Sequence, residues 1–344
     1  MSEVASRVDP SGDAPSGDDV AIRYDVVGVG NALVDVISHA SDAFIVEHDL
    51  VKGSMTLVGT DRAMELYEAL GGAVEMSGGS AANTMCGVAS LGGKAAYIGK
   101  VSSDDLGQVF GHDLRAVGVQ FRPGRPDPET PTGRCIIVVT PDAERTMNTY
   151  LGTSSLLCTS DIDDATVAAG AVLYMEGYLF DRDEAKAAFR HAARVAHAHS
   201  RKVSLTLSDS FCVDRHRVDF RALVADEVDI LFGNADEIVS LYEVSTLDEA
   251  IEAVRRDCSL TLVTVGADGV IVVTPDGVLR EPAQPVPKVL DTTGAGDLFA
   301  AGFLFGYTRE MSLKECARIG GVAAGEVISH VGPRPLVPLT TLVR

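Results

Sequence analysis

The chain has 344 residues, of which 46% are hydrophobic and 23% charged, a composition that is typical of a globular protein and excludes a wholly disordered chain. Its formal net charge of −20 argues against a nucleic-acid backbone or an anionic membrane as the main partner. The 34 glycines are an excess over average usage, and clusters of them would indicate close approach of the backbone to a ligand.

Targeting signals are absent from the sequence. Residues 1–20 are polar, acidic and rich in Gly, Pro and Asp, which predicts a disordered tail rather than a signal peptide. No apolar run approaches the roughly 18 residues that are needed to cross a bilayer. The six cysteines lack any C-x-x-C spacing and are predicted to be reduced thiols. These features predict a cytoplasmic protein.

After the tail, short apolar β-branched runs alternate with segments of helical periodicity. The runs predict strands at residues 24–29, 135–140, 171–175, 203–207, 228–232, 260–265 and 270–273. The periodic segments predict helices at residues 61–70, 80–91, 104–117, 183–199, 236–242, 247–256, 297–308 and 313–328. This alternation is typical of an α/β fold with a doubly wound, mainly parallel sheet flanked by helices, in one domain over residues 21–344. Such sheets bind ligands beyond the carboxyl ends of their strands. Two segments that fit the alternation poorly, about 36–57 and 119–150, are predicted to form a small β lid over that edge.

Three common glycine motifs are excluded by their spacing. A P-loop needs Ser or Thr after its Gly-Lys pair, but Ala95 follows Gly93-Lys94. The dinucleotide fingerprint fails because its third glycine is missing after Gly28 and Gly30. The nucleophile elbow G-x-S-x-G is also missing. P-loop NTPases, NAD enzymes with this fingerprint and α/β-hydrolases are therefore poor interpretations.

The most informative segment is DTTGAGD at residues 291–297, which begins an apolar helical pattern. Successive N–H groups of Gly294, Ala295 and Gly296 at a helix start would form an anion-binding concavity. Asp297, at its edge, suits a general base that removes a hydroxyl proton as the oxygen attacks phosphorus. A simple helix cap is the alternative, but a cap does not need the glycines and threonines that precede it.

Three other segments suit the same chemistry. Asp35 ends the run GNALVD, where a carboxylate could hold vicinal hydroxyls of a sugar. The segment GGSAAN at residues 78–83 begins a helix with small residues and ends in Asn83, for which a solvated helix position is the alternative. Asn234 and Glu237 share a helix face and could hold hydrated Mg²⁺ and phosphate oxygens. Taken alone, that pair is better interpreted as a helix cap.

These motifs resemble those of the ribokinase-like (PfkB) family of sugar and nucleoside kinases. DTTGAGD is similar to the family's C-terminal signature, GGSAAN with LGGK at residues 91–94 to its N-terminal signature, and Asn234-x-x-Glu237 to its N-x-x-E motif. The resemblance covers about residues 24–335 and implies a ribokinase-like fold. Segments at residues 30–35, 148–152, 176–179, 207–211 and 332–335 look most like those of bacterial adenosine kinases.

The resemblance implies that the protein uses ATP and Mg²⁺ to phosphorylate the 5′-hydroxyl of adenosine, giving AMP in purine salvage. It implies Asp297 as the base and Gly294, Ala295 and Gly296 as the anion hole for the phosphoryl group. It assigns the acceptor to Asn31, Asp35, Leu57, Gly79, Ser80, Asn83, Tyr178 and Leu179. It assigns ATP to Arg145, Asn234, Glu237, Thr264, Gly266 and Gly269, with Glu237 organising Mg²⁺ indirectly. Asp291 and Thr293 would hold a monovalent cation such as K⁺.

Other interpretations stay open at this point. Leu57, Tyr178 and Leu179 could equally be core residues, and Arg145 could be a solvated turn residue. A fructokinase- or ribokinase-like sugar kinase, or an inosine or guanosine kinase, would share the catalytic residues. A non-catalytic paralogue would have lost Asp297 or the anion hole, and neither is lost. The resemblance is compatible with a monomer or a homodimer, binding small molecules and neither nucleic acid nor membrane.

Overall fold

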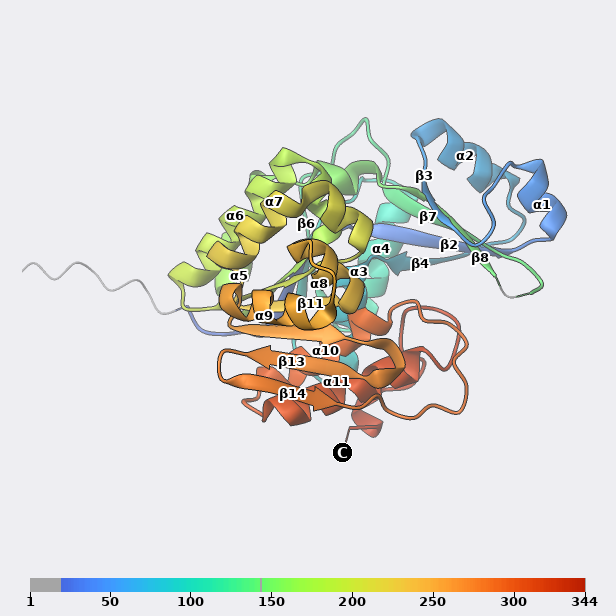
Figure 1. Cartoon of the computed structure of the whole chain (residues 1–344). Helices are drawn as coiled ribbons and strands as arrows, with labels where there is room; N and C mark the ends of the chain where they lie inside the picture. Colours follow the sequence, from blue (N-terminus) through green and yellow to red (C-terminus); the bar gives the residue numbers. More distant parts are fainter. Residues whose placement is uncertain (1–19, 143, 344) are drawn as a thin grey trace, which may run out of the picture.

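The computed structural model describes residues 20–142 and 144–343, so the tail predicted over residues 1–20 lies outside the described residues apart from Val20. The strands described form a large sheet of nine strands and a small sheet of five (Figure 1). The large sheet has the order β14 (Gly277–Glu281), β13 (Val270–Thr274), β12 (Leu260–Thr264), β11 (Ile230–Asn234), β10 (Lys202–Thr206), β9 (Gly170–Glu176), β1 (Tyr24–Val29), β5 (Ala95–Gly99) and β6 (Gln120–Pro123). Neighbours from β12 to β6 pair in parallel, while β13 and β14 are antiparallel additions at one edge.

Helices cover both faces of the large sheet, which is why its central strands are apolar on both sides. In β1, Val26, Val27 and Val29 are all fully buried. One face packs against α5 (Asp164–Ala168), α6 (Asp183–Ala198), α7 (Ser210–Glu227), α8 (Ala235–Tyr242) and α9 (Leu247–Asp257). The other face packs against α3 (Ser80–Ser90), α4 (Asp105–Ala116), α10 (Ala295–Tyr307) and α11 (Leu313–Val327).

The small sheet lies at the upper right of Figure 1, beside the large unit. Its order is β3 (Met55–Leu57), β8 (Arg145–Tyr150), β7 (Gly133–Val139), β2 (Leu33–His39) and β4 (Val74–Gly78). Helices α1 (Asp42–Glu47) and α2 (Thr60–Ala69) contribute Ile45 and Leu66 to the hydrophobic core on one side of this sheet. Its other side bears Asp35, Cys135 and Ile137, which line the pocket described below.

The predicted fold class, a doubly wound, mainly parallel sheet flanked by helices with a small second sheet, is confirmed. The structure corrects several details, and strands β5 and β14 of the large sheet were not among the predicted strands. Helix α7 was not predicted, because it is kinked at His216 and its apolar residues keep no single helical period. Strand β4 belongs to the small sheet but lies outside both predicted lid segments. Strand β6 lies inside the predicted 119–150 segment but pairs with β5 in the large sheet.

No helix in the described part of the chain combines the length and the apolar character that a membrane crossing would require. All six cysteines are free thiols.

Candidate active site

A pocket of about 1210 Å³ lies between the carboxyl ends of the large-sheet strands and the small sheet. Residues at or just beyond the ends of successive parallel strands line it, namely Asn31, Glu176, Thr206, Asn234 and Thr264. This is the edge at which doubly wound sheets bind ligands. The N-terminal residues of α3 and α10 complete its floor.

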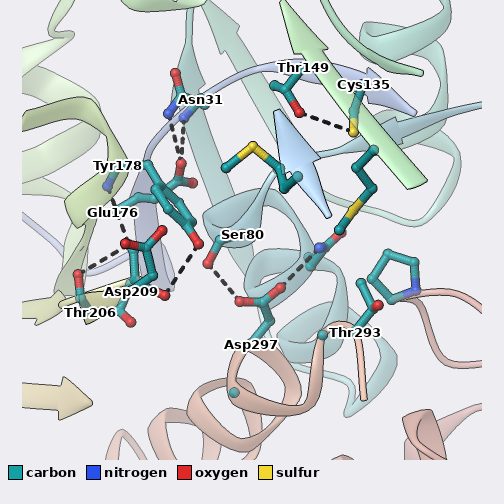
Figure 2. A pocket seen from close by; sticks show the side chains of 18 of the residues that line it. Asn31, Ser80, Cys135, Thr149, Glu176, Tyr178, Thr206, Asp209, Thr293 and Asp297 are labelled. Atoms are coloured by element: carbon teal, nitrogen blue, oxygen red, sulfur yellow. Dashed lines mark hydrogen bonds between the residues drawn. The ribbon is translucent and has the colours of Figure 1, made fainter. Parts of the chain in front are cut away.

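Asp297, in the first turn of α10, is held between two side chains of α3. Ser80 Oγ donates to Asp297 Oδ1 at 2.6 Å, and Asn83 Nδ2 donates to Asp297 Oδ2 at 3.0 Å. Figure 2 shows Ser80 and Asp297 turned toward each other at the floor of the pocket. Burial raises the pKa of Asp297, against the lowering effect of these hydrogen bonds and of the Arg334 charge. The carboxylate is therefore fixed in place and more basic than an exposed aspartate.

The loop before α10 presents backbone N–H groups beside that carboxylate. Gly294 has φ +80 and begins the helix in the left-handed conformation, and a Cβ at this position would collide with Pro333. The N–H of Ala295 donates to the carbonyl of Thr292 at 3.1 Å. The N–H groups of Gly294, Gly296 and Asp297 have no acceptor within the described residues. Three open donors at a helix N-terminus can bind an anion, and Ala295 is not one of them.

Asp35 projects into the pocket from β2 and is 9% exposed. Burial raises its pKa to about 6, opposed by the charges of Arg334 and Arg145, while the charge of Asp297 adds to the rise. No side chain or backbone group in the described ranges donates a hydrogen bond to it. Gly79, at the start of α3, has φ +93, and a Cβ there would overlap the carbonyl oxygen of Asn31. Both residues line the same part of the pocket wall.

Arg145 reaches from the small sheet to the loop before α10. Its Nη1 lies 2.8 Å from Asp291 Oδ2 and 3.5 Å from Thr293 Oγ1. Asp291 also accepts from the N–H and hydroxyl of Thr293 and from the N–H of Gly332. Burial raises the pKa of Asp291, but these hydrogen bonds and the Arg145 charge lower it below its ordinary value. Nη2 of Arg145 is buried without any hydrogen-bond partner in the described structure.

Asn234 and Glu237 form a reciprocal capping box at the start of α8. Asn234 Oδ1 accepts from the Glu237 N–H at 2.9 Å, and Glu237 Oε2 accepts from the Asn234 N–H at 2.9 Å. The helix-cap interpretation is therefore confirmed, and both residues also line the pocket. Burial, with the charges of Asp209 and Asp236, raises the pKa of Glu237 to about 7. A cation near this carboxylate would relieve that repulsion.

Glu176 is a pocket residue that the sequence analysis did not single out. Its carboxylate accepts from Asn31 Nδ2 at 2.9 Å and from the Ala81 N–H at 2.8 Å, as Figure 2 shows for Asn31. Asn31 Oδ1 accepts from Ser154 Oγ, so both ends of this amide are held by the protein. Burial raises the pKa of Glu176 to about 7. A glutamate ending an apolar strand at the ligand edge was the signal that could have found it.

The wall opposite the floor is apolar. We call it the acceptor wall; it consists of Leu33, Met55, Leu57, Ile137 and Met147 of the small sheet. Leu57 and Met55 are 52% and 47% exposed, although their side chains are hydrophobic. Tyr178 lines the pocket from the large unit, and its hydroxyl donates to the Ser208 carbonyl. Phe211, at the start of α7, also lines the pocket and is 75% exposed, and it was missed with that helix.

Five predicted residues lie outside the pocket lining, namely Arg145, Leu179, Gly266, Gly269 and Asp291. Leu179 was expected to contact a purine, but it is 3% exposed and packs in the core. The short 3₁₀ helix Gly177–Asp181 directs Tyr178 to the pocket and Leu179 inward. Gly266 and Gly269, expected to border ATP, form the turn between β12 and β13, where a Cβ on Gly269 would overlap the Glu281 carbonyl. Thr264, just before this turn, does line the pocket.

Comparison with known proteins places the chain among kinases. Residues 55–339 match the pfkB family of carbohydrate kinases. An adenosine kinase from Sinorhizobium meliloti is 52% identical with a TM-score of 0.85, covering 93% of this chain and 98% of that one. A "probable sugar kinase" from Rhizobium etli CFN 42 is 46% identical with a TM-score of 0.86, over the same shares. Adenosine kinase 2 of Arabidopsis thaliana is 26% identical over 90% of this chain and 96% of its own length.

Proposed function

The chain belongs to the pfkB family of carbohydrate kinases, and from this premise we propose that it transfers the γ-phosphoryl group of ATP to the 5′-hydroxyl of adenosine. The observation that carries the proposal is the meeting of the Asp297 carboxylate with open backbone N–H groups at the floor of one pocket. Adenosine is the preferred acceptor because the Sinorhizobium meliloti protein, at 52% identity, is an adenosine kinase.

Asp297 acts as the general base in this proposal. Ser80 and Asn83 hold its two oxygens, so it accepts the 5′-hydroxyl proton with little reorganisation as the oxygen attacks phosphorus. Its raised pKa makes it a stronger base than an ordinary aspartate. The bond from the γ-phosphorus to the β–γ bridging oxygen breaks as the new bond to the 5′-oxygen forms, and ADP leaves with its charge.

The anion hole stabilises the charge of the transferring phosphoryl group. The N–H groups of Gly294, Gly296 and Asp297 are available for its oxygens, with the positive end of the α10 dipole behind them. Ala295 contributes its small size, which leaves room beside the backbone. Because the donors are fixed before ATP arrives, they require no rearrangement during transfer.

The acceptor's ribose binds beside Asp35 and Gly79. The Asp35 carboxylate is accessible from the pocket and can accept hydrogen bonds from the two vicinal hydroxyls. Asn83 Nδ2 carries a second hydrogen beyond the one donated to Asp297, and that hydrogen can reach a hydroxyl. Asn31 acts through its bond to Glu176, which fixes the wall next to the sugar. Leu57 and Tyr178 contact the purine from opposite sides of the pocket.

Arg145 provides positive charge for the γ-phosphate. The buried Nη2 group lacks a hydrogen-bond partner among the described residues, and an unsatisfied buried donor of this kind is costly unless a ligand accepts from it. The same geometry does not fit a monovalent cation at Asp291. Both oxygens of that carboxylate already accept from Arg145, Thr293 and Gly332, so no step is assigned to K⁺.

Asn234 and Glu237 fit a role toward Mg²⁺ through water rather than as direct ligands. Their polar atoms are bonded to each other, and no cluster of three metal-ligating side chains occurs in the part of the chain described here. The raised pKa of Glu237 indicates a site that favours a nearby cation. Bound with ATP, Mg²⁺ would neutralise charge on the phosphate oxygens.

An ATP-consumption assay with adenosine, inosine, guanosine, ribose and fructose tests the proposal. We expect adenosine to give the highest kcat/KM, with AMP identified as the product by chromatography. Turnover of fructose or ribose without adenosine would support a sugar kinase, the activity named for the Rhizobium etli relative. The Asp297→Asn variant, assayed in parallel, controls for contaminating kinases.

A further inference from the structure

Arg334 lies in the segment after α11 and outside the lining of the pocket. It nevertheless reaches back to helix α3 and strand β4. Its Nε donates to Asn83 Oδ1 at 2.7 Å, its Nη1 to Cys86 Sγ at 2.6 Å, and its Nη2 to the Ser77 carbonyl at 2.7 Å. A planar guanidinium with these three acceptors has very little freedom to move.

The contact with Asn83 decides which way that amide points. A side-chain amide has one accepting and one donating end, and only the donating end can serve a carboxylate. Because Arg334 is always a donor, it retains Oδ1 on its own side and leaves Nδ2 facing Asp297. Without Arg334, Asn83 could turn its oxygen toward Asp297, and two acceptors would then repel each other.

The Arg334 charge also acts at the floor of the pocket. It lowers the pKa of Asp297 and of Asp35, against the stronger effect of burial. The other charged groups that face these carboxylates are Arg145 from the small sheet, which lowers the pKa of Asp35, and Glu176 from β9. Removing Arg334 therefore leaves Asp297 and Asp35 with less positive charge to stabilise their ionised forms.

We propose that Arg334 is a positioning residue for phosphoryl transfer, which orients Asn83 so that this amide holds the Asp297 base. The inference rests on the proposed function of Asp297. Arg334 itself touches neither substrate in this assignment. Arg334 and Asn83 are 251 residues apart in the sequence, so their side chains meet only in the folded protein.

The Arg334→Gln variant tests the inference by its kinetics. We expect kcat to fall by about 10–100-fold, as for other residues that orient a reacting group, while the KM for the acceptor changes by less than about threefold. The acid limb of the kcat profile should move to higher pH, since Asp297 loses a lowering charge. Added guanidinium should restore part of kcat, and Arg334→Lys should lie between wild type and Arg334→Gln.

A double-mutant cycle separates positioning from general stability. In the Asn83→Ala background, Arg334→Gln should change kcat by less than about threefold, because there is no amide left to orient. An equal loss of kcat in both backgrounds would overturn the inference. Arg318→Gln, which removes a surface pair with Glu315 on α11, is the matched control and should leave kcat unchanged. If Arg334→Gln fails to fold, Arg334→Lys is used in the same cycle with the same expectations.

Titration of Asp297, followed by NMR of its carboxyl carbon, needs no turnover. It therefore distinguishes a failure of the inference about Arg334 from a failure of the proposed function. A rise of the Asp297 pKa on Arg334→Gln that is larger with Asn83 present than in the Asn83→Ala background supports the inference even if the wild-type acceptor differs from adenosine. An unchanged Asp297 pKa, together with unchanged kcat, contradicts the inference alone. A wild-type protein that phosphorylates no acceptor contradicts the proposed function alone.

Discussion

Two sides of one pocket differ in how their residues are held. The catalytic floor, formed by Ser80, Asn83, Asp297 and the Arg334 behind them, is polar, and its groups bond to one another. The acceptor wall on the small sheet is apolar, and Met55 and Leu57 on it are about half exposed. Phosphoryl transfer needs fixed donors and a fixed base, whereas acceptor binding needs a surface that can be covered by the substrate. Changes at the floor should therefore affect kcat, and changes at the wall should affect KM.

Asp297→Asn should give the largest effect and is the strongest test of the floor. We expect kcat to fall by about 10²–10⁴-fold, because an amide cannot accept the hydroxyl proton. Adenosine binding, measured by calorimetry, should change little. Asp276→Asn, in an exposed turn, is the control. If the Asp297 variant lost binding and kept kcat, the division between floor and wall would be wrong.

Arg145 joins the two sides and should give the next largest effect. Arg145→Gln removes a charge beside the anion hole, and we expect kcat/KM for ATP to fall by about 10²-fold. Potassium should not restore kcat/KM, because the Asp291 carboxylate still accepts hydrogen bonds from Thr293 and Gly332. Steady-state kinetics with varied ATP, in sodium and in potassium buffers, provides the measurement. Restoration of activity by K⁺ alone would show that a cation does bind there.

Asp35 gives a pH dependence of binding. With its pKa raised to about 6, it is ionised above that pH and protonated below it. Affinity for a vicinal diol should therefore be constant above pH 7 and fall up to about tenfold per unit below pH 6. Calorimetry with 5′-deoxyadenosine, which keeps both ribose hydroxyls but has no 5′-hydroxyl, measures this without turnover. The 2′,3′-dideoxy nucleoside should show a much weaker dependence, and equal dependence for both would remove Asp35 from the ribose site.

Leu57→Ala should give the smallest effect and tests the acceptor wall. Loss of its apolar contact should raise the KM for adenosine by about 3–10-fold and leave kcat unchanged. The melting temperature should change little, because the side chain is already 52% exposed. Val51→Ala, exposed and outside the pocket lining, is the matched control. A fall in kcat with constant KM would mean that Leu57 acts on the floor instead.

Local signals account for what the sequence predicted well. Strands β1 and β9 to β13 of the large sheet and most of its helices follow from apolar periodicity, whereas β5, β6 and β14 were not predicted. DTTGAGD is contiguous, so Asp297 and its glycines could be placed together from the sequence. Failures occurred where local periodicity carries no information. Helix α7 is kinked, and the 3₁₀ turn at Tyr178 and Leu179 reverses which neighbour faces the pocket. Arg334 obtains its place from contacts across the fold, which no spacing in the sequence encodes, whereas Glu176 could have been found as the glutamate that ends an apolar strand.

The long separation between Asn83 and Arg334 has a consequence for how the protein is made. Helix α3 leaves the ribosome 251 residues before the arginine that orients its amide, which is about 13–50 s at about 5–20 residues per second. During most of that interval α10, against which α3 packs in the folded protein, has not yet been synthesised, so this face of α3 stays uncovered. The nascent chain thus exposes apolar surface for most of its synthesis, and only after residue 334 has emerged can the catalytic centre form.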